Sequence, residues 1–237
     1  MLKGTTVVVL GGSAGIGLAV AEAAAKDGAR VIIASSNPSR VDAAVARIPG
    51  AHGHAVDLRS EPAVRALFER IGAHDHLVYT AGEELMLAPV SELDLQKARQ
   101  FFELRYWGAL SAIRIARPLL RKNGSVVLTS GLASRRPHPG FAIGASICGA
   151  MEALTRALAV ELAPLRVNIV TPGFVETELW SNIPLPARQE MFATAAAQLP
   201  LKHVGRPEEI AEHYLGFMRG SYVTGQSLVV DGGGALV

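Results

Sequence analysis

The chain has 237 residues, of which 49% are hydrophobic and 19% charged, so it can fill a large core and general disorder is excluded. Lysine and arginine number 23 and aspartate and glutamate 21, and this near balance, without a basic cluster, argues against nucleic-acid binding. The uncharged stretches 4–21 and 137–151 are interrupted by glycine or proline, which argues against a membrane span. The single cysteine, Cys148, leaves no internal disulfide and favours a reducing, cytoplasmic location.

Short β-branched runs alternate along the chain with longer alanine-rich stretches, which is typical of parallel strands joined by crossover helices. The run Val7-Val8-Val9-Leu10 is apolar at every position, as expected for a strand buried on both faces. The sequence therefore predicts one α/β domain over residues 1–237, a single Rossmann-type, doubly wound parallel sheet of about seven strands with helices on both faces. In chain order the predicted elements are strand Thr6–Leu10, helix Gly15–Asp27, strand Arg30–Ala34, helix Ser39–Arg47, strand His54–Val56, helix Glu61–Ile71, strand His76–Thr80, helix Leu95–Leu120, strand Ser125–Thr129, helix Ile143–Leu162, strand Val167–Val170, helix Ala187–Gln198, helix Glu208–Arg219 and strand Ser227–Val230.

A glycine-rich turn joins the first predicted strand to the first predicted helix. It reads Gly11-Gly12-Ser13-Ala14-Gly15-Ile16-Gly17. Glycines let the backbone approach a pyrophosphate closely, and the free N–H groups at the start of the helix then bind its negative charge. A plain tight turn is the alternative, but the position between a buried strand and a helix favours a dinucleotide site.

The spacing of these glycines resembles the short-chain dehydrogenase/reductase family, and further motifs follow in order over nearly the whole chain. Asp57-Leu58 stands where the family's acidic residue meets the adenine ring, and Thr80-Ala81-Gly82 stands where the family has an Asn-Ala-Gly turn. Pro172-Gly173-Phe174-Val175-Glu176-Thr177 matches the family's Pro-Gly-xxx-Thr cofactor loop. The resemblance implies a nicotinamide cofactor, with binding residues Gly11, Ser13, Ala14, Gly15, Ile16, Gly17, Asp57, Leu58, Ala81, Gly82, Pro172, Gly173, Val175 and Thr177.

The turn after the second predicted strand bears on the choice of cofactor. A carboxylate there would bind the ribose hydroxyls of NAD and repel a 2′-phosphate. The turn reads Ser35-Ser36-Asn37, with no acid, and these side chains donate hydrogen bonds to a phosphate, with Arg40 adding charge if it lies close. A polar turn that caps the next helix would use the same residues, and the two roles are compatible. The sequence therefore predicts a preference for NADP(H).

The expected catalytic residues depart from the family pattern. Typical members reduce a carbonyl with a serine, a tyrosine and a lysine, supported by an asparagine on the preceding helix. Ser130 occupies the serine position, but Ile143 and Ile147 stand at the tyrosine and lysine positions. Arg105 replaces the asparagine and is suited to polarise a carbonyl or hold the nicotinamide ribose, unless it is a structural residue paired with Glu103 or Glu152. Ser130 and Arg105 are therefore the catalytic candidates of an atypical member, and the loop from Arg135 to His138 is the next candidate.

An insertion at about residues 174–206 carries many large apolar side chains, and family members use this region as a lid over the substrate. Its composition favours an apolar small molecule, although packing on the core or on a neighbouring subunit is the alternative. Two pairs of histidines, at 52 and 54 and at 74 and 76, lack an acid or cysteine that would complete a tetrahedral set, so no metal is predicted.

Two functions remain open at this stage. The first is an oxidoreductase that transfers hydride between NADP(H) and an apolar carbonyl, quinone or activated alkene. The second is a catalytically impaired protein that binds NADP(H) and reports its state to a partner. The long helices predicted at 95–120 and 143–162 are rich in small residues, and the resemblance implies that they form the seam of a homodimer or homotetramer.

Overall fold

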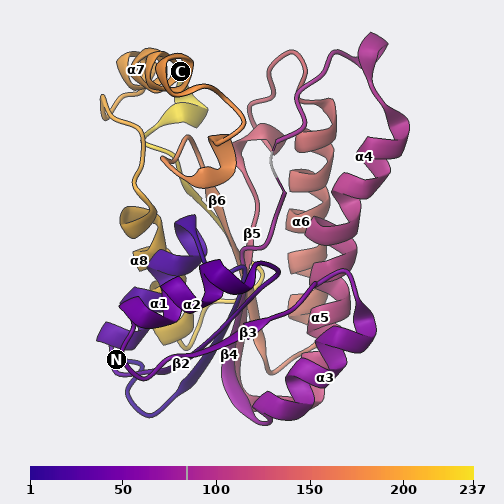
Figure 1. Ribbon diagram of the computed structural model, residues 1–237, viewed down its shortest axis with the longest axis vertical. Helices are drawn as coiled ribbons and strands as arrows, with labels where there is room; N and C mark the ends of the chain where they lie inside the picture. Colours follow the sequence, from indigo (N-terminus) through magenta and orange to yellow (C-terminus); the bar gives the residue numbers. More distant parts are fainter. Residues whose placement is uncertain (84) are drawn as a thin grey trace.

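The core of the molecule is one seven-stranded sheet, seen in a computed structural model that describes residues 1–83 and 85–237 (Figure 1). The strands are all parallel and lie in the order β3-β2-β1-β4-β5-β6-β7. The strand order reverses between β1 and β4, and ligands bind such sheets outside the carboxyl ends of the strands at this point. The predicted fold class is confirmed. The strands are β1 (Thr6–Leu10), β2 (Arg30–Ser35), β3 (His52–Ala55), β4 (His74–Tyr79), β5 (Leu120–Thr129), β6 (Arg166–Pro172) and β7 (Ser227–Val230).

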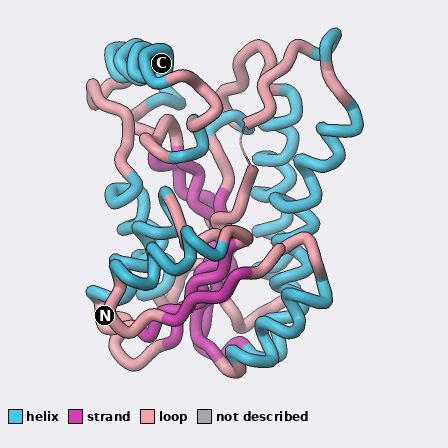
Figure 2. The backbone as a smooth tube through the Cα atoms, viewed as in Figure 1, coloured by secondary structure: helices cyan, strands magenta, loops and turns pink. Residues whose placement is uncertain are grey.

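Helices cover both faces of the sheet, as Figure 2 shows. The first and last helices pack together on one face, and the helices from the middle of the chain cover the other. The first face is covered by α1 (Gly15–Lys26), α2 (Pro38–Arg47) and α8 (Pro207–Arg219). The second face is covered by α3 (Glu61–Ile71), α5 (Ala109–Ala116) and α6 (Ala142–Glu161), and α4 (Leu95–Phe102) precedes α5. The helix α7 (Leu185–Gln198) lies beyond the carboxyl ends of the strands (Figure 1).

The alternation of side chains along β1 explains why its sequence is apolar throughout. Val7 and Val9 pack into the cluster beneath α1 and α8, while Val8 and Leu10 pack into the cluster beneath α3, α5 and α6. All four side chains are fully buried, because successive side chains of a strand point to opposite faces and both faces are covered.

The prediction of one continuous helix over Leu95–Leu120 is wrong, because a wide π-helical turn at Glu103–Gly108 separates α4 from α5. The hydroxyl of the buried Tyr79 donates a hydrogen bond of 2.6 Å to the Leu104 carbonyl oxygen within this turn. Gly108 leaves room for that hydroxyl, since a Cβ there would lie 2.7 Å from it. A side chain inserted into the helical ladder is a known cause of such turns. The turn carries Arg105.

The helix α6 is long and apolar enough to cross a membrane by length and composition. In the structure it packs against β5 and β6, and Met151, Thr155 and Leu158 are buried on its inner side. Only part of its apolar surface covers the sheet, since 28% of its most apolar window is buried in the molecule.

Candidate active site

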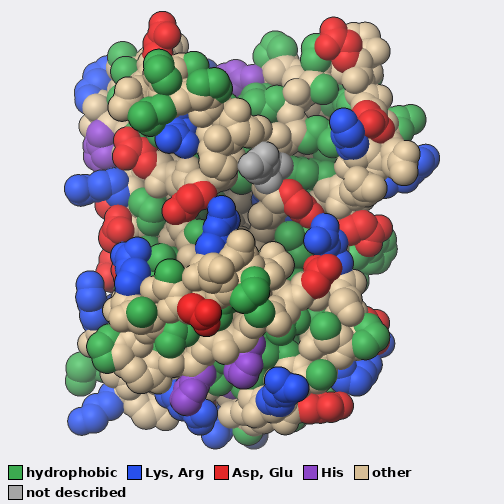
Figure 3. All heavy atoms as spheres, in the orientation of Figure 1, with side chains coloured by type: hydrophobic (Ala, Val, Ile, Leu, Met, Phe, Trp, Pro, Cys, Tyr) green, Lys and Arg blue, Asp and Glu red, His purple; other side chains and the backbone are tan. Residues whose placement is uncertain are grey.

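A cavity of about 430 Å³ opens beyond the carboxyl ends of the central strands. The surface is hollowed near the middle of the face seen in Figure 3, where basic and acidic side chains surround the depression. Every residue that the sequence assigns to cofactor binding or catalysis lines this one cavity, although the roles themselves remain predictions. These residues are Gly11, Ser13, Ala14, Gly15, Ile16, Gly17, Ser35, Ser36, Asn37, Asp57, Leu58, Ala81, Gly82, Arg105, Ser130, Pro172, Gly173, Val175 and Thr177.

The glycine turn is built for close packing between β1 and α1. A Cβ at Gly17 would lie 2.3 Å from the Gly11 carbonyl oxygen and 2.4 Å from Thr80 Oγ1, so no larger residue fits there. Thr80 donates from its hydroxyl to the carbonyl oxygens of Leu10 and Gly11, each at 3.2 Å, and so ties β4 to the turn. The helix α1 begins without a side-chain cap and without an acidic residue in its first turn, which leaves its first N–H groups available to an anion.

The turn after β2 serves as a cap and lines the cavity. Asn37 Oδ1 accepts a hydrogen bond of 3.0 Å from the Arg40 backbone N–H, which starts α2. Ser35, Ser36 and Arg40 line the same end of the cavity. The capping role considered from the sequence is confirmed for Asn37, and the serine hydroxyls and Arg40 supply donors beside it.

Asp57 is held as an anion by the residue two positions further on. The Arg59 backbone N–H donates to Asp57 Oδ1 at 3.0 Å and Arg59 Nε donates to the same oxygen at 3.1 Å. These contacts, the backbone one first, hold the pKa of Asp57 below its ordinary value. Arg59 itself lines the cavity and was missed from the sequence, where only its spacing from Asp57 could have signalled it.

Arg105 lies against Gly82 and Glu83, not against Glu103 or Glu152 as considered from the sequence. A Cβ on Gly82 would come within 2.6 Å of the guanidinium carbon, so glycine is needed for this approach. The guanidinium donates to the Glu83 carbonyl oxygen, and its Nε lies 3.7 Å from Glu83 Oε2. The other face of the guanidinium stacks on Phe101, 4.7 Å from the ring centroid. Burial lowers the pKa of Arg105 and raises that of Glu83.

Ser130 is connected to a buried carboxylate on α6. Its hydroxyl donates to the Cys148 carbonyl oxygen at 3.2 Å and to Glu152 Oε1 at 3.3 Å. Glu152 also accepts from Ser134 at 2.7 Å and from Arg135 at 3.4 Å. The sequence did not reveal this network, because its members are brought together only when the loop after β5 folds onto α6.

The wall that α6 contributes to the cavity is apolar apart from the Cys148 thiol. Ile147 is buried and lines the cavity together with Gly144 and Cys148, whereas Ile143 is not among the lining residues. The expectation that both isoleucines face the cavity is therefore wrong for Ile143. Within residues 1–83 and 85–237 the lining contains no tyrosine and no lysine. Burial raises the pKa of the Cys148 thiol.

The predicted lid contributes only in part to the cavity. Phe174, Leu179 and Trp180 line it, and Trp180 is fixed by a hydrogen bond from its Nε1 to the Val175 carbonyl oxygen at 3.0 Å and by stacking on Phe174. The apolar side chains of α7 lie outside the lining. The other apolar walls come from segments that the sequence analysis did not single out, with Leu85, Met86, Leu87, Phe101, Leu104, Leu132 and Phe141.

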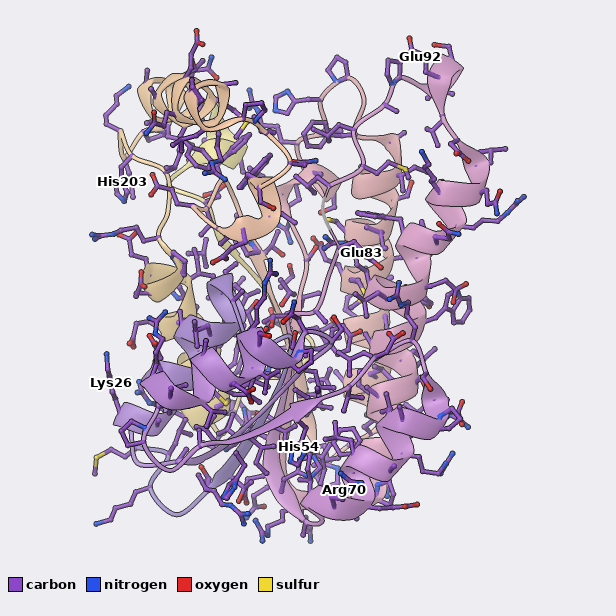
Figure 4. The ribbon with its side chains drawn as sticks, in the orientation of Figure 1. Lys26, His54, Arg70, Glu83, Glu92 and His203 are labelled. Atoms are coloured by element: carbon purple, nitrogen blue, oxygen red, sulfur yellow. The ribbon has the colours of Figure 1, made fainter. Side chains whose placement is uncertain are left out.

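The histidine pairs lie in β3 and β4, and none of the four histidines lines the cavity. His54 of β3 is labelled in Figure 4. Over the part of the chain that the structure describes, no three histidine, cysteine, aspartate or glutamate side chains are grouped as a metal site.

The sheet order, the glycine turn and the position of the cavity together define a dinucleotide-binding α/β protein of the Rossmann type. Sequence comparison gives the family. The model of the family described as enoyl-(acyl carrier protein) reductase matches residues 11–234. The chain is 36% identical to the short-chain dehydrogenase/reductase ATR9 of Stachybotrys chlorohalonatus, over 100% of this chain and 98% of that protein. This chain therefore belongs to the short-chain dehydrogenase/reductase family of oxidoreductases.

Solved structures agree with this assignment. A small-chain dehydrogenase in complex with NADPH is 34% identical, with a TM-score of 0.85 over 98% of this chain and 99% of that one. The MalC reductase/Diels-Alderase from Malbranchea aurantiaca is 28% identical, with a TM-score of 0.93 over 100% of this chain and 98% of that one. Both are similar to this chain along its whole length.

Proposed function

We propose that this protein transfers hydride between NADP(H) and an apolar carbonyl, quinone or activated alkene, at a site that lacks the family's tyrosine and lysine. The observation that carries the proposal is a single cavity that joins the phosphate-binding turn, the acid-free turn after β2 and Arg105 to a set of apolar walls. The NADPH complex of a similar dehydrogenase supports the choice of cofactor.

The residues present fit this cofactor. The uncapped start of α1 suits the pyrophosphate, because free N–H groups and the helix dipole favour an anion there. Ser36 and Arg40 suit a 2′-phosphate, and Asp57 suits the adenine. The bound dinucleotide supplies or takes up a hydride at its nicotinamide ring.

Arg105 is the residue best placed to stabilise negative charge that develops on a substrate oxygen. It is held by Gly82, Glu83 and Phe101, so its orientation is fixed before substrate binds. A guanidinium is a poor proton donor. The Ser130 hydroxyl lines the same cavity, and we assign it to hydrogen bonding the substrate oxygen, for which its hydrogen turns away from the Cys148 and Glu152 oxygens that accept it without substrate.

The second candidate, a catalytically impaired NADP(H)-binding sensor, has one observation in its favour: a described cavity lining that contains no tyrosine or lysine. The apolar walls beside Arg105 favour the enzyme, because a sensor of the dinucleotide alone has no need of a substrate compartment.

The test is NADPH oxidation with a panel of quinones, diketones, ketones and enones. Turnover with at least one acceptor is expected, and Ser130→Ala and Arg105→Ala each lower kcat about a hundredfold, the usual loss on removing one such group. Ser146→Ala is the matched control, since its hydroxyl donates to the carbonyl oxygen of Ala142 on its own helix. Tight NADPH binding with no turnover on any acceptor would favour the sensor.

A further inference from the structure

Among the described residues that line the cavity, Glu83 is an acidic side chain beside Arg105, and neither candidate function assigns it a role. It directly follows Ala81-Gly82, beyond the end of β4, and lies in the interior between the strand ends and α6 (Figure 4). Both carboxyl oxygens are buried, and neither has a hydrogen-bond partner from another described residue. Arg105 Nε lies 3.7 Å from Glu83 Oε2, so the positive charge of the guanidinium is close to the carboxyl group although the two atoms form no hydrogen bond.

The surroundings of Glu83 shift its pKa upward. Burial raises the pKa, and this effect outweighs the hydrogen bond from its own backbone N–H and the attraction of Arg105 and Arg59, which all act in the opposite direction. Tyr79 is another titratable side chain near Glu83. Its hydroxyl donates its hydrogen bond to the Leu104 carbonyl oxygen, so it does not donate one to the Glu83 carboxylate. An ionised carboxylate that lacks donors from other residues costs more free energy in such a place than a neutral carboxylic acid does.

The other polar side chains of the cavity are poorly suited to release a proton to a substrate. The Ser130 hydrogen is directed to acceptors on α6. The guanidinium of Arg105 remains a fixed charge, and burial raises the pKa of the Cys148 thiol. His138 lines the cavity but is exposed, with its ring edge against Phe141, and it is the rival donor.

We propose that Glu83, with its carboxyl group turned from its buried position into the cavity that the residue lines, is the acid that protonates the substrate oxygen in the place of the missing tyrosine. This inference rests on the proposed oxidoreductase function. In the reductive direction the carbonyl carbon receives a hydride from the reduced cofactor, the carbon–oxygen π bond breaks and its electron pair moves to oxygen. That oxygen takes the proton of the Glu83 carboxyl, which yields an alcohol, the oxidised cofactor and a carboxylate that water protonates again. Arg105, next to the carboxylate, stabilises the charge left on it.

The kinetic test uses Glu83→Gln, which keeps the shape of the side chain and removes the acid. We expect kcat for a ketone or diketone to fall about a hundredfold or more, while the NADPH dissociation constant changes little. With a nitroalkene, which accepts hydride at carbon and leaves a stable nitronate, the variant keeps most of its rate because no proton is needed in that step. Glu83→Asp restores part of the ketone activity. The matched control is Glu92→Gln, at the far end of the loop before α4 (Figure 4).

Two measurements separate an acid from a residue that only positions Arg105. The rate of ketone reduction falls as pH rises through the pKa of Glu83, and this limb disappears in Glu83→Gln but persists in His138→Ala. Infrared spectra of the protein without cofactor or substrate contain the carbonyl band of a protonated carboxylic acid that titrates above the ordinary range of glutamate and is absent from Glu83→Gln.

The outcomes separate this inference from the function on which it rests. No NADPH oxidation by the unsubstituted protein with any acceptor overturns the proposed function, and the role of Glu83 with it. Turnover at equal rates by the unsubstituted protein and Glu83→Gln overturns the role of Glu83 alone. A third outcome is that Glu83→Gln loses the nitroalkene reaction as well as the ketone reaction, and that the infrared band is missing from the unsubstituted protein and the variant alike. In that case Glu83 is only a structural partner of Arg105, and its role as an acid is overturned. Loss of the alkaline limb in His138→Ala assigns the proton to that histidine instead.

Discussion

Ser36 is the residue at which the choice of cofactor is most directly tested. It lines the cavity in a turn that contains no carboxylate, beside Ser35 and Arg40. We predict that Ser36→Asp weakens NADPH binding at least about tenfold, because its carboxylate repels the 2′-phosphate, and that NADH binding is unchanged or stronger. Titration of cofactor fluorescence measures both affinities. Ser39→Asp, exposed on the first turn of α2 and outside the lining, is the control, and an equal loss in both variants would contradict the assignment.

At the scale of elements, the contact between β1 and α1 depends on the absence of a side chain at Gly17. A Cβ there would lie 2.3 Å from the Gly11 carbonyl oxygen, which is backbone, so a simple rotamer change cannot relieve the contact. We predict that Gly17→Ala lowers the free energy of unfolding by about 1–3 kcal/mol, the usual cost of overpacking. Urea denaturation measures this loss.

Gly216→Ala in α8 is the matched comparison for Gly17→Ala. Nothing lies within 4 Å of a Cβ at Gly216, and an alanine in a helix is favoured over glycine by about 0.5–1 kcal/mol. The two substitutions are therefore expected to change stability in opposite directions. Equal effects would mean that the β1–α1 contact tolerates a methyl group.

At the scale of the whole molecule, a buried histidine makes stability depend on pH. Burial lowers the pKa of His76 to about 4, and its Nδ1 lies 2.9 Å from Ser125 Oγ. In the unfolded chain the imidazole takes up a proton below about pH 6.5, whereas in the folded protein it stays neutral down to about 4. The unfolded state therefore binds more protons as pH falls across this window, and stability decreases by on the order of 3 kcal/mol.

Urea denaturation at neutral pH and at about pH 5 tests this dependence. His76→Asn keeps a polar atom near Ser125 and cannot titrate, so it is expected to lose less stability on acidification. Part of the loss remains in this variant, because burial also lowers the pKa of His74. The exposed His52→Asn is the control, and an unchanged slope in His76→Asn would assign the acid sensitivity to other groups.

We propose that two or four copies of the chain assemble through the faces of α5 and α6. Trp107, in the π-helical turn, is 54% exposed and Val160 of α6 is 81% exposed. Light scattering after size exclusion is expected to give a dimer or tetramer, and Trp107→Glu with Val160→Glu to give monomers, because the charges are buried on association. Val90→Glu, exposed in the loop before α4, leaves the assembly intact. A monomer without any substitution would exclude this assembly.

The sequence by itself determined the sheet, its helices and the end of the cavity that suits a dinucleotide. The apolar run Val7–Leu10 and the glycine turn are formed by residues that are adjacent in the chain, so their patterns can be recognised in the sequence. The sequence also predicted departures from the family pattern at Ile143, Ile147 and Arg105, of which Ile147 and Arg105 line the cavity.

Only the tertiary structure decided what surrounds Arg105. Its partner Glu83 is 22 residues away in sequence, and the π-helical turn that carries Arg105 follows from a hydroxyl that Tyr79 brings from β4. The network of Ser130 with Glu152 and the apolar walls from 85–87 likewise join segments that are distant in the chain. Burial and hydrogen-bond partners are properties of the packed molecule, and they raise the pKa of Glu83, so no local pattern of residues could have indicated the role that we propose for it.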